Sequence, residues 1–229
     1  MEQTMFETLM NLPLFKGVSY KRLSEIVGNT KLAFMKYLQG ETLIFPDDTC
    51  DSLKFILSGK VRLAISTHDE RFTVSSVLEG PSVIMPEYLF GRSTVYPCRV
   101  TAVDSVSVMQ ISKSDLTRLL STDEIFLFNY INLISSSAQK SVEGVLALTS
   151  GSLEERIAFW VLALSQHDSK DIILSCRQRD LCAVFGVQRS SFTAALDHLK
   201  SLGYIDYTSD SIKVKSRRDM ASLLIYARD

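Results

Sequence analysis

The chain has 229 residues, of which 46% are hydrophobic and 22% are charged, and its formal net charge is −1. That length is comfortable for two domains, and the near-zero charge argues against a protein that coats nucleic acids through its overall charge. No segment approaches the roughly 18 consecutive apolar residues of a membrane helix, and the acidic N-terminal segment lacks the basic start of a signal peptide. We therefore expect a cytoplasmic protein with no membrane contact.

Four cysteines are scattered along the chain without CxxC spacing: Cys50, Cys98, Cys176 and Cys182. Structural disulfides are rare in a chain long enough to build its own core, and zinc or iron–sulfur sites need ligands that cluster. The three histidines are also far apart in the sequence. The pattern predicts buried thiols, no bound metal and no metal cofactor.

The first half of the chain changes from helical to strand-like patterning near residue 31. Residues 1–30 are typical of short helices, and Ser19 is a candidate N-cap. Residues 31–111 contain many short β-prone runs separated by turn residues, among them Ser58-Gly59 and Gly80-Pro81. Short strands at this spacing favour a sandwich, barrel or roll.

A long helix follows, over residues 123–148, after a capping-box-like start at Ser112 and Asp115. A helix of about 25 residues spans about 38 Å, which exceeds what a domain of this size needs for its own core. Its apolar residues fit a heptad seam that suggests pairing with a second copy of the chain. The alternative is a core helix that packs only on its own sheet. The candidate seam residues are Leu127, Ile131, Ile134, Ala138 and Val145.

Residues 180–205 have the pattern of a helix-turn-helix after a small, polar boundary at 149–155. Gly186 suits a turn that requires positive φ, and the first helix carries small residues where the second can pack. The apolar residues expected to close the angle between the helices are Leu181, Val184, Val187, Phe192 and Leu196. An ordinary helical hairpin used only for stability is the competing interpretation.

The same region carries a local excess of positive charge. From Arg177 to Arg218 there are eight Lys or Arg residues against four Asp residues, as expected of a surface that contacts phosphates. Residues 203–216 alternate as a two-stranded wing after the second helix. Arg189 at the start of the second helix can donate two hydrogen bonds to guanine. The candidate DNA-binding residues are Arg177, Gln178, Arg179, Gln188, Arg189, Ser190, Ser191, Thr193, Lys213 and Lys215.

Three segments together resemble the cAMP receptor protein/FNR (Crp/Fnr) family of bacterial transcription regulators. They are "GETLIFPDDTCDSLKFILSGKVRL", "LEERIAFWVLAL" and "RQRDLCAVFGVQRSSFTAALDHLKSLGYI". The resemblance implies an α+β chain with a cyclic-nucleotide-binding-type β-roll (a jelly roll, residues 1–122). It also implies a dimerisation helix and hinge (123–150) and a winged helix-turn-helix (151–229). A member of this family is expected to bind a near-palindromic operator in double-stranded DNA as a homodimer, and to contact RNA polymerase.

The chain departs from the cAMP-binding pattern where the phosphate would be held. The position that resembles the family's phosphate-pairing arginine is Tyr96, and its hydroxyl neighbour is Pro97. A cyclic phosphate needs a cation and N–H donors, and strand alternation turns Arg99 to the other face. We therefore predict an effector other than cAMP, of unknown identity. The candidate effector-pocket residues are Glu87, Tyr88, Tyr96, Pro97 and Cys98.

Three further interpretations compete with the effector-controlled regulator. The first is an effector-independent DNA-binding regulator. The second is an enzyme built on a metal-binding β-roll, which would need several histidines where the strand region has only His68, and no catalytic set is evident. The third is a binding module whose helix-turn-helix contacts proteins. The absence of DNA binding at low salt would distinguish the third interpretation from the first.

Overall fold

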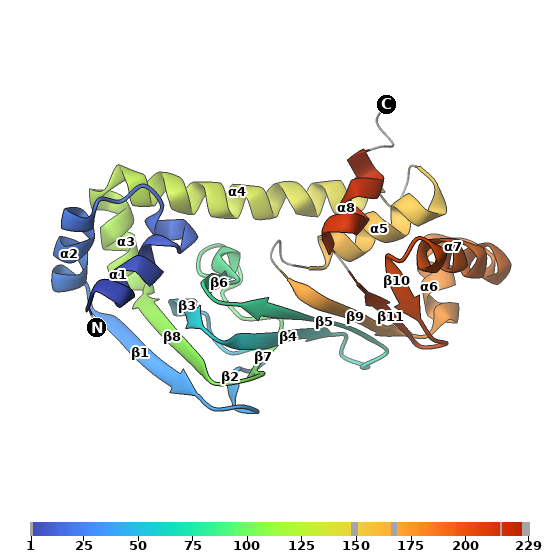
Figure 1. Ribbon diagram of the computed structural model, residues 1–229, viewed down its shortest axis with the longest axis horizontal. Helices are drawn as coiled ribbons and strands as arrows, with labels where there is room; N and C mark the ends of the chain where they lie inside the picture. The colour runs from blue at the N-terminus through green and yellow to red at the C-terminus, as the bar shows by residue number, and fades with distance from the viewer. Residues whose placement is uncertain (1, 148–150, 166–168, 216, 226–229) are drawn as a thin grey trace. The chain divides into compact units, whose positions relative to one another are not determined.

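A computed structural model describes residues 2–147, 151–165, 169–215 and 217–225 (Figure 1). The chain forms two compact units. Unit 1 comprises Met1–Arg62 and Glu79–Ala138, and unit 2 comprises Leu63–Leu78 and Gln139–Asp229. Residues 63–78 therefore belong with the C-terminal part of the chain, although they lie within the strand-rich segment of the sequence.

Unit 1 begins with helices whose starts were predicted from capping residues. The Ser19 side chain accepts a hydrogen bond from the Arg22 backbone N–H, and the Ser112 side chain accepts one from the Asp115 N–H. Both N-caps are confirmed. The elements are α1 (Glu2–Met10), η1 (Pro13–Phe15), α2 (Tyr20–Asn29) and α3 (Lys113–Thr122).

The strands of unit 1 form the predicted roll. One antiparallel sheet has the order β1-β8-β3-β6, and β2 pairs separately with β7. Their bounds are β1 (Leu32–Tyr37), β2 (Thr42–Ile44), β3 (Ser52–Ser58), β6 (Ser82–Ile84), β7 (Arg99–Ala102) and β8 (Val106–Ser112), and a short helix, η2 (Pro86–Tyr88), follows β6. Strand β3 is buried on both faces, because Phe55 packs against Phe15 of η1 at a centroid distance of 5.9 Å while Ile56 faces the other side.

Gly59 ends β3 at a position that no other residue fits. Its φ is +87°, and a Cβ atom there would lie 2.4 Å from the Ser105 carbonyl oxygen. Because glycine alone combines a positive φ with this close approach, the Leu-x-Gly-x-Val part of the resemblance has a direct structural cause.

The long helix α4 (Glu124–Ala147) matches the predicted range (Figure 1). Its inner face in unit 1 carries the buried residues Phe126 and Tyr130. Phe126 packs edge-on against Phe15, and the Tyr130 hydroxyl donates a hydrogen bond to the Pro86 carbonyl at 2.8 Å. Among the described residues, no helix is both long enough and apolar enough to cross a membrane.

Unit 2 is a winged helix with a strand that the sequence analysis missed. Its strands lie in the order β10-β11-β9-β5-β4 within a seven-stranded sheet, and the missed strand is β9. The Ser152–Glu155 capping box starts its first helix. The elements are β4 (Lys60–Ser66, which begins in unit 1), β5 (Phe72–Glu79), α5 (Leu153–Ala163), β9 (Lys170–Cys176), α6 (Gln178–Phe185), α7 (Arg189–Ser201), β10 (Ile205–Tyr207), β11 (Ser211–Val214) and α8 (Arg217–Ile225).

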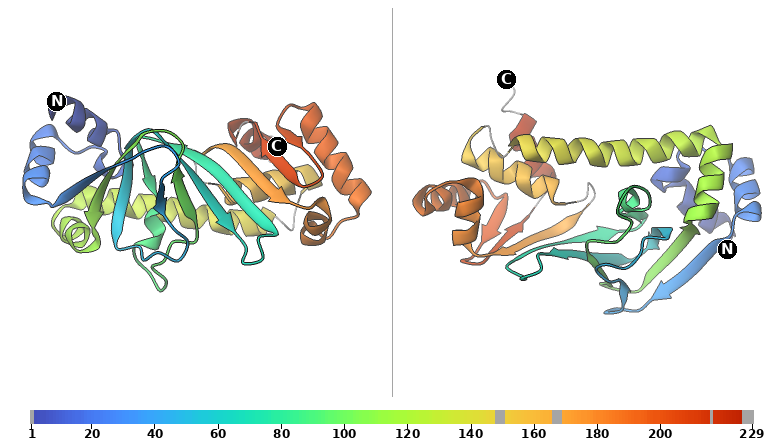
Figure 2. Two further views of the ribbon diagram at one scale, coloured as in Figure 1. Left: turned by 90° about the horizontal axis from the view of Figure 1, so that it is seen from below. Right: turned by 180° about the vertical axis from the view of Figure 1, so that it is seen from behind.

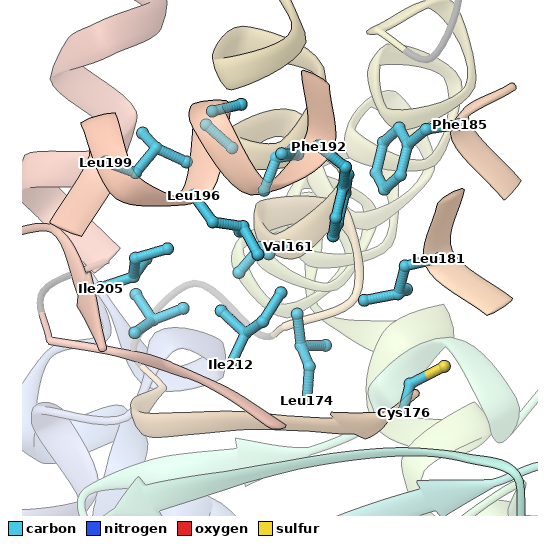
Figure 3. Close-up of a cluster of buried hydrophobic side chains, with 14 of the residues drawn as sticks. Val161, Leu174, Cys176, Leu181, Phe185, Phe192, Leu196, Leu199, Ile205 and Ile212 are labelled. Atoms are coloured by element: carbon cyan, nitrogen blue, oxygen red, sulfur yellow. The ribbon is translucent and has the colours of Figure 1, made fainter. Parts of the chain in front are cut away.

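The helices of unit 2 pack on this sheet through one apolar core (Figure 3). Leu181, Phe192 and Leu196 are buried in it as predicted, and Val187 packs at its edge. The prediction for Val184 is wrong, because its side chain is 56% exposed and Phe185 occupies the core instead. The buried positions of α6 form one arc centred on Phe185, and Val184 lies about 100° away from that centre at 3.6 residues per turn.

Candidate nucleic-acid interface

The turn between α6 and α7 has the backbone geometry that a helix-turn-helix requires. Gly186 caps α6 in the left-handed conformation, with φ +64° and ψ +37°. The N–H groups of Gly186 and Val187 donate to the carbonyls of Ala183 and Cys182, at 3.3 and 3.1 Å. These bonds satisfy helix-end carbonyls that would otherwise lack partners. The positive φ predicted for Gly186 is confirmed.

Helix α7 has one buried face and one exposed polar face. Phe192, Ala195, Leu196 and Leu199 are buried, at the i, i+3, i+4 and i+7 spacing of an amphipathic helix. Of the predicted DNA-binding residues in this region, Thr193 is half-buried. The others lie exposed at the start of the helix: Gln188, Arg189, Ser190 and Ser191.

The N-terminus of α7 has no side-chain cap. Gln188 is the N-cap residue, and its side chain makes no capping hydrogen bond. The first N–H groups of a helix lack partners within the helix, and the helix dipole favours a negative charge at that end. The exposed Arg189 adds a full positive charge at the same place. The start of α7 is therefore suited to contact a phosphate or the edge of a base.

The three candidates at the start of α6 differ in how much of each side chain is available. Arg177 and Arg179 are exposed, and Arg179 lies 3.4 Å from the carboxylate of Asp180. Gln178 is half-buried, and its amide donates to the Thr208 carbonyl at 2.9 Å. Gln178 thus anchors the wing turn with one of its donors.

The wing has the predicted two strands, with Ile205 paired to Val214 and Tyr207 paired to Ile212. Lys213 and Lys215 both project into solvent. The ammonium of Lys215 pairs with Asp206 across the wing at 3.1 Å. Of the two wing lysines, only Lys215 has an ion pair among the described residues, so the charge of Lys213 is not offset in this way.

Two of the predicted effector-pocket residues, Tyr96 and Cys98, are buried inside the roll. Tyr96 is 1% exposed, and its hydroxyl donates to the Ser52 carbonyl at 3.4 Å. The Cys98 sulfur is fully buried and lies 3.5 Å from that of Met85. Burial raises the pKa of Tyr96 well above its usual value and raises the pKa of Cys98 to about 12. Both side chains are therefore neutral fillers at neutral pH.

The remaining effector-pocket candidates are less deeply buried, although Glu87 and Tyr88 lie close enough to Cys98 to interact with it electrostatically. Glu87 is exposed, and Tyr88 and Pro97 are half-buried. Arg99 is exposed as predicted from strand alternation, with its guanidinium 5.2 Å from the centre of the Phe45 ring. The structure brings Tyr96 and Cys98 together in the interior and leaves the carboxylate of Glu87 at the surface. Within the described residues, no group of three or more His, Cys, Asp or Glu side chains could hold a metal ion.

Four residues of the predicted seam lie on the part of α4 whose side chains are described. Leu127 and Ile131 are 37% and 40% exposed, Ala138 is exposed, and Ile134 is half-buried. The side chain of Val145 lies outside the described residues. The inner face holds Phe126 and Tyr130, so α4 serves its own unit with one side and exposes apolar residues on another.

Three residues that matter for the helix-turn-helix were not singled out as site residues. Arg156 of α5 donates to the Phe185 carbonyl at 2.6 Å. Trp160 of α5 and Phe72 of β5 pack toward the same turn. No local pattern in the sequence indicates which distant residues Trp160 contacts.

Two family models match the chain in separate regions. A cyclic nucleotide-binding domain matches residues 34–123, and a Crp-like helix-turn-helix domain matches residues 155–223. No match was found among curated protein sequences.

Many solved structures are similar to the chain at low identity. A CooA mutant from Carboxydothermus hydrogenoformans has 12% identity and a TM-score of 0.51, with 90% of this chain and 92% of that chain covered. A transcriptional regulator from Thermotoga maritima has 18% identity and a TM-score of 0.50, with 56% of this chain and 98% of that chain covered. The catabolite activator protein of Thermus thermophilus has 15% identity and a TM-score of 0.49, with 93% and 99% covered.

The fold and the matched models agree with the three segments that carried the resemblance. The roll, the long helix and the winged helix-turn-helix are all present in the described residues. The chain belongs to the Crp/Fnr family of DNA-binding transcription regulators.

Proposed function

We propose that the protein is a homodimeric, sequence-specific transcription regulator that binds a near-palindromic operator. The observation that carries this proposal is the exposed polar start of α7, held outward by the buried residues on its other face. A helix presented in this way fits the major groove, where side chains at its N-terminus reach base edges.

Within this proposal the interface residues divide into two roles. Arg189 reads a base, because its guanidinium can donate two hydrogen bonds to guanine. The N–H groups at the start of α7, together with Arg177, Arg179 and Lys213, contact phosphates and set the register of the protein on the duplex. Ser190 and Ser191 serve either role, since a hydroxyl can donate to a phosphate or to a base edge.

DNA binding is tested by selecting bound duplexes from a random library and titrating the selected duplex at several salt concentrations. We expect an enriched near-palindromic site and an affinity that falls steeply as salt rises, because phosphate contacts release counterions. If no duplex binds even at low salt, the proposal is wrong and a helix-turn-helix that contacts proteins becomes the better interpretation.

The outer face of α4 supports the homodimer. Leu127, Ile131, Ile134 and Ala138 follow the 4-3-4 spacing of a coiled-coil seam, and the first two are exposed in the single chain. Two copies paired through this face would present two α7 helices to successive major grooves, about 34 Å apart.

The dimer is tested by sedimentation of Ile131→Asp, Ile134→Asp and the matched control Asn132→Asp. Asn132 is exposed on the same helix but lies off the seam. We expect monomers for both isoleucine variants and a dimer for the control, because a buried unpaired carboxylate is costly at an apolar interface. A dimeric Ile131→Asp variant would show that the seam is placed on the wrong face.

The filled roll supports control by an effector other than cAMP. Tyr96 occupies the interior with a neutral ring, and a cyclic phosphate needs a cation there. The same observation favours a second candidate, a regulator that needs no effector. A thermal-shift screen of the full chain against cAMP and a metabolite library separates the two: one specific stabilising compound supports an effector, and operator binding unaffected by every compound supports the alternative.

We further propose that the regulator acts in the cytoplasm and contacts RNA polymerase. In vitro transcription from a promoter containing the selected site tests this contact and shows whether the outcome is activation or repression.

A further inference from the structure

The hairpin formed by β4 and β5 contributes a strand to the winged-helix sheet. Strand β5 pairs antiparallel with β9 from Phe72 opposite Cys176 to Val77 opposite Lys170. Figure 2 shows the hairpin (cyan) running beside β9 (orange). An edge strand exposes unpaired backbone groups, and on this side of β9 those groups are used by β5. The hairpin is therefore part of the sheet that supports the helix-turn-helix.

The hairpin also supplies side chains to the core beneath the helix-turn-helix. Val74 is 4% exposed and belongs to the same apolar cluster as Phe185, Phe192 and Leu196. Phe72, two residues earlier and on the same face of the strand, packs against this cluster. Thr73 lies between them on the opposite face, where its hydroxyl is 2.9 Å from that of Ser66.

Four aromatic rings form a continuous row from the hairpin to α7. The ring centroids of Phe72 and Trp160 are 5.2 Å apart, those of Trp160 and Phe185 are 5.4 Å apart, and those of Phe185 and Phe192 are 5.8 Å apart. All three separations lie in the range in which aromatic pairs attract one another. Phe192 is fully buried and lies three residues after Arg189, so the row ends beneath the exposed start of the helix.

Arg156 of α5 holds the same turn through a hydrogen bond to the backbone of α6. Its guanidinium donates to the Phe185 carbonyl at 2.6 Å and lies 5.7 Å from the centre of the Phe185 ring. A cation at the carbonyl end of α6 is also favoured by the dipole of that helix. With the carbonyl of Phe185 held, a displacement of its ring changes the packing of Phe192 directly.

We propose that the β4–β5 hairpin positions the recognition helix through the row Phe72–Trp160–Phe185–Phe192, with Phe72 as a positioning residue for DNA recognition. The proposal rests on the DNA-binding function proposed above. Helix α7 is preorganised when the row is intact, and it must be reordered on binding when the row is broken. Residues 63–78 of the hairpin belong to unit 2, and the chain enters this segment from Arg62 and leaves it at Glu79, both of unit 1.

The test compares the full-length protein with Phe72→Ala, and with Thr73→Ala as a matched control on the opposite face of the same strand. Trp160 is the single tryptophan of the chain, so its emission reports the row directly. We expect Phe72→Ala to shift the emission to longer wavelength and to increase quenching by acrylamide, because one neighbour of the indole is removed. Thr73→Ala should leave both signals unchanged.

The functional readout is affinity for the selected operator relative to an unrelated duplex. We expect Phe72→Ala to weaken operator binding about 3- to 10-fold, as the loss of one aromatic contact predicts, and to leave non-specific binding nearly unchanged. Phe72→Tyr, which keeps the ring, should restore the affinity. Variants are compared at a temperature where circular dichroism shows that each is fully folded, so that general instability is separated from positioning.

Each outcome decides one of the two proposals. If the parent protein binds no duplex, the proposed function fails. If the parent binds the operator and Phe72→Ala binds it equally well or more tightly, the positioning role of the hairpin is overturned. An equal loss for operator and unrelated DNA also overturns it, because a positioning residue acts on sequence reading.

Discussion

The candidate residues in the roll interior and those at the start of α7 differ in exposure: the former are partly buried in packing, and the latter lie in solvent. In the roll, the ring of Tyr96, a predicted effector-pocket residue, is buried. On α7, an arginine and two serines remain exposed beside an uncapped helix end. One region uses its side chains for packing, and the other leaves them available for a partner. A fold does not by itself assign a function, so each of the two regions must be judged from its own residues.

The largest expected effect comes from removing the buried Tyr96 side chain from the roll. Tyr96→Ala removes a fully buried ring, and we expect a loss of about 3–5 kcal/mol in unfolding free energy, because the cavity adds to the lost burial. Urea denaturation measures the change. Tyr20→Ala is the matched control, since Tyr20 is 53% exposed and should lose far less. Similar losses for both variants would mean that Tyr96 does not fill the roll.

The next largest effect is expected at the reading surface. Arg189→Ala should cost about 1–3 kcal/mol of specific DNA binding, or roughly 5- to 150-fold, because it removes a bidentate base contact. Its unfolding free energy should stay unchanged, since the side chain is exposed. Arg218→Ala removes the same charge from an exposed position on α8 and serves as the control for simple electrostatics. Equal losses for the two variants would remove Arg189 from its base-reading role.

A smaller effect on stability is expected at Gly186, in the turn that precedes α7. Gly186→Ala should destabilise the protein by about 1–2 kcal/mol, because a Cβ atom is disfavoured at φ +64°. No atom lies within 4 Å of the added methyl group, so the cost is confined to the backbone. Gly28→Ala, within α2 and equally open, should be neutral or slightly stabilising by thermal unfolding. A neutral Gly186→Ala would contradict the left-handed turn.

The smallest effect is a pH dependence of the roll. The pKa of Cys98 is raised to about 12 by burial, so its neutral thiol contributes stability that is complete below the unfolded pKa, near 9. That contribution declines as pH rises from about 9 toward 12, and it should fall by about 1 kcal/mol by pH 10. Denaturant titrations at pH 8 and pH 10 should show a smaller fall for Cys98→Ala. An identical fall in the parent protein and in Cys98→Ala would mean that another group causes the loss of stability.

Local sequence signals predicted much of unit 2 and the helix starts of unit 1. Ser19 and Ser112 were recognised as N-caps because a hydroxyl before a helical pattern satisfies nearby N–H groups. Gly186 was placed in a turn because positive φ favours glycine. The exposed start of α7 followed from the positions of Phe192 and Leu196, since 3.6-residue periodicity assigns both faces of a helix at once.

The capped helices, the glycine turns, the amphipathic faces and the family could be predicted from sequence, because each depends on residues close together in the chain. The pairing of β9 with β5, the entry of Phe185 rather than Val184 into the core and the contact of Phe72 with the helix-turn-helix became apparent in the folded chain. The β5–β9 pair and the contact of Phe72 with Trp160 join segments about 100 residues apart. Periodicity shows that one face of an element is apolar. Packing across the whole unit selects the distant element that covers this face.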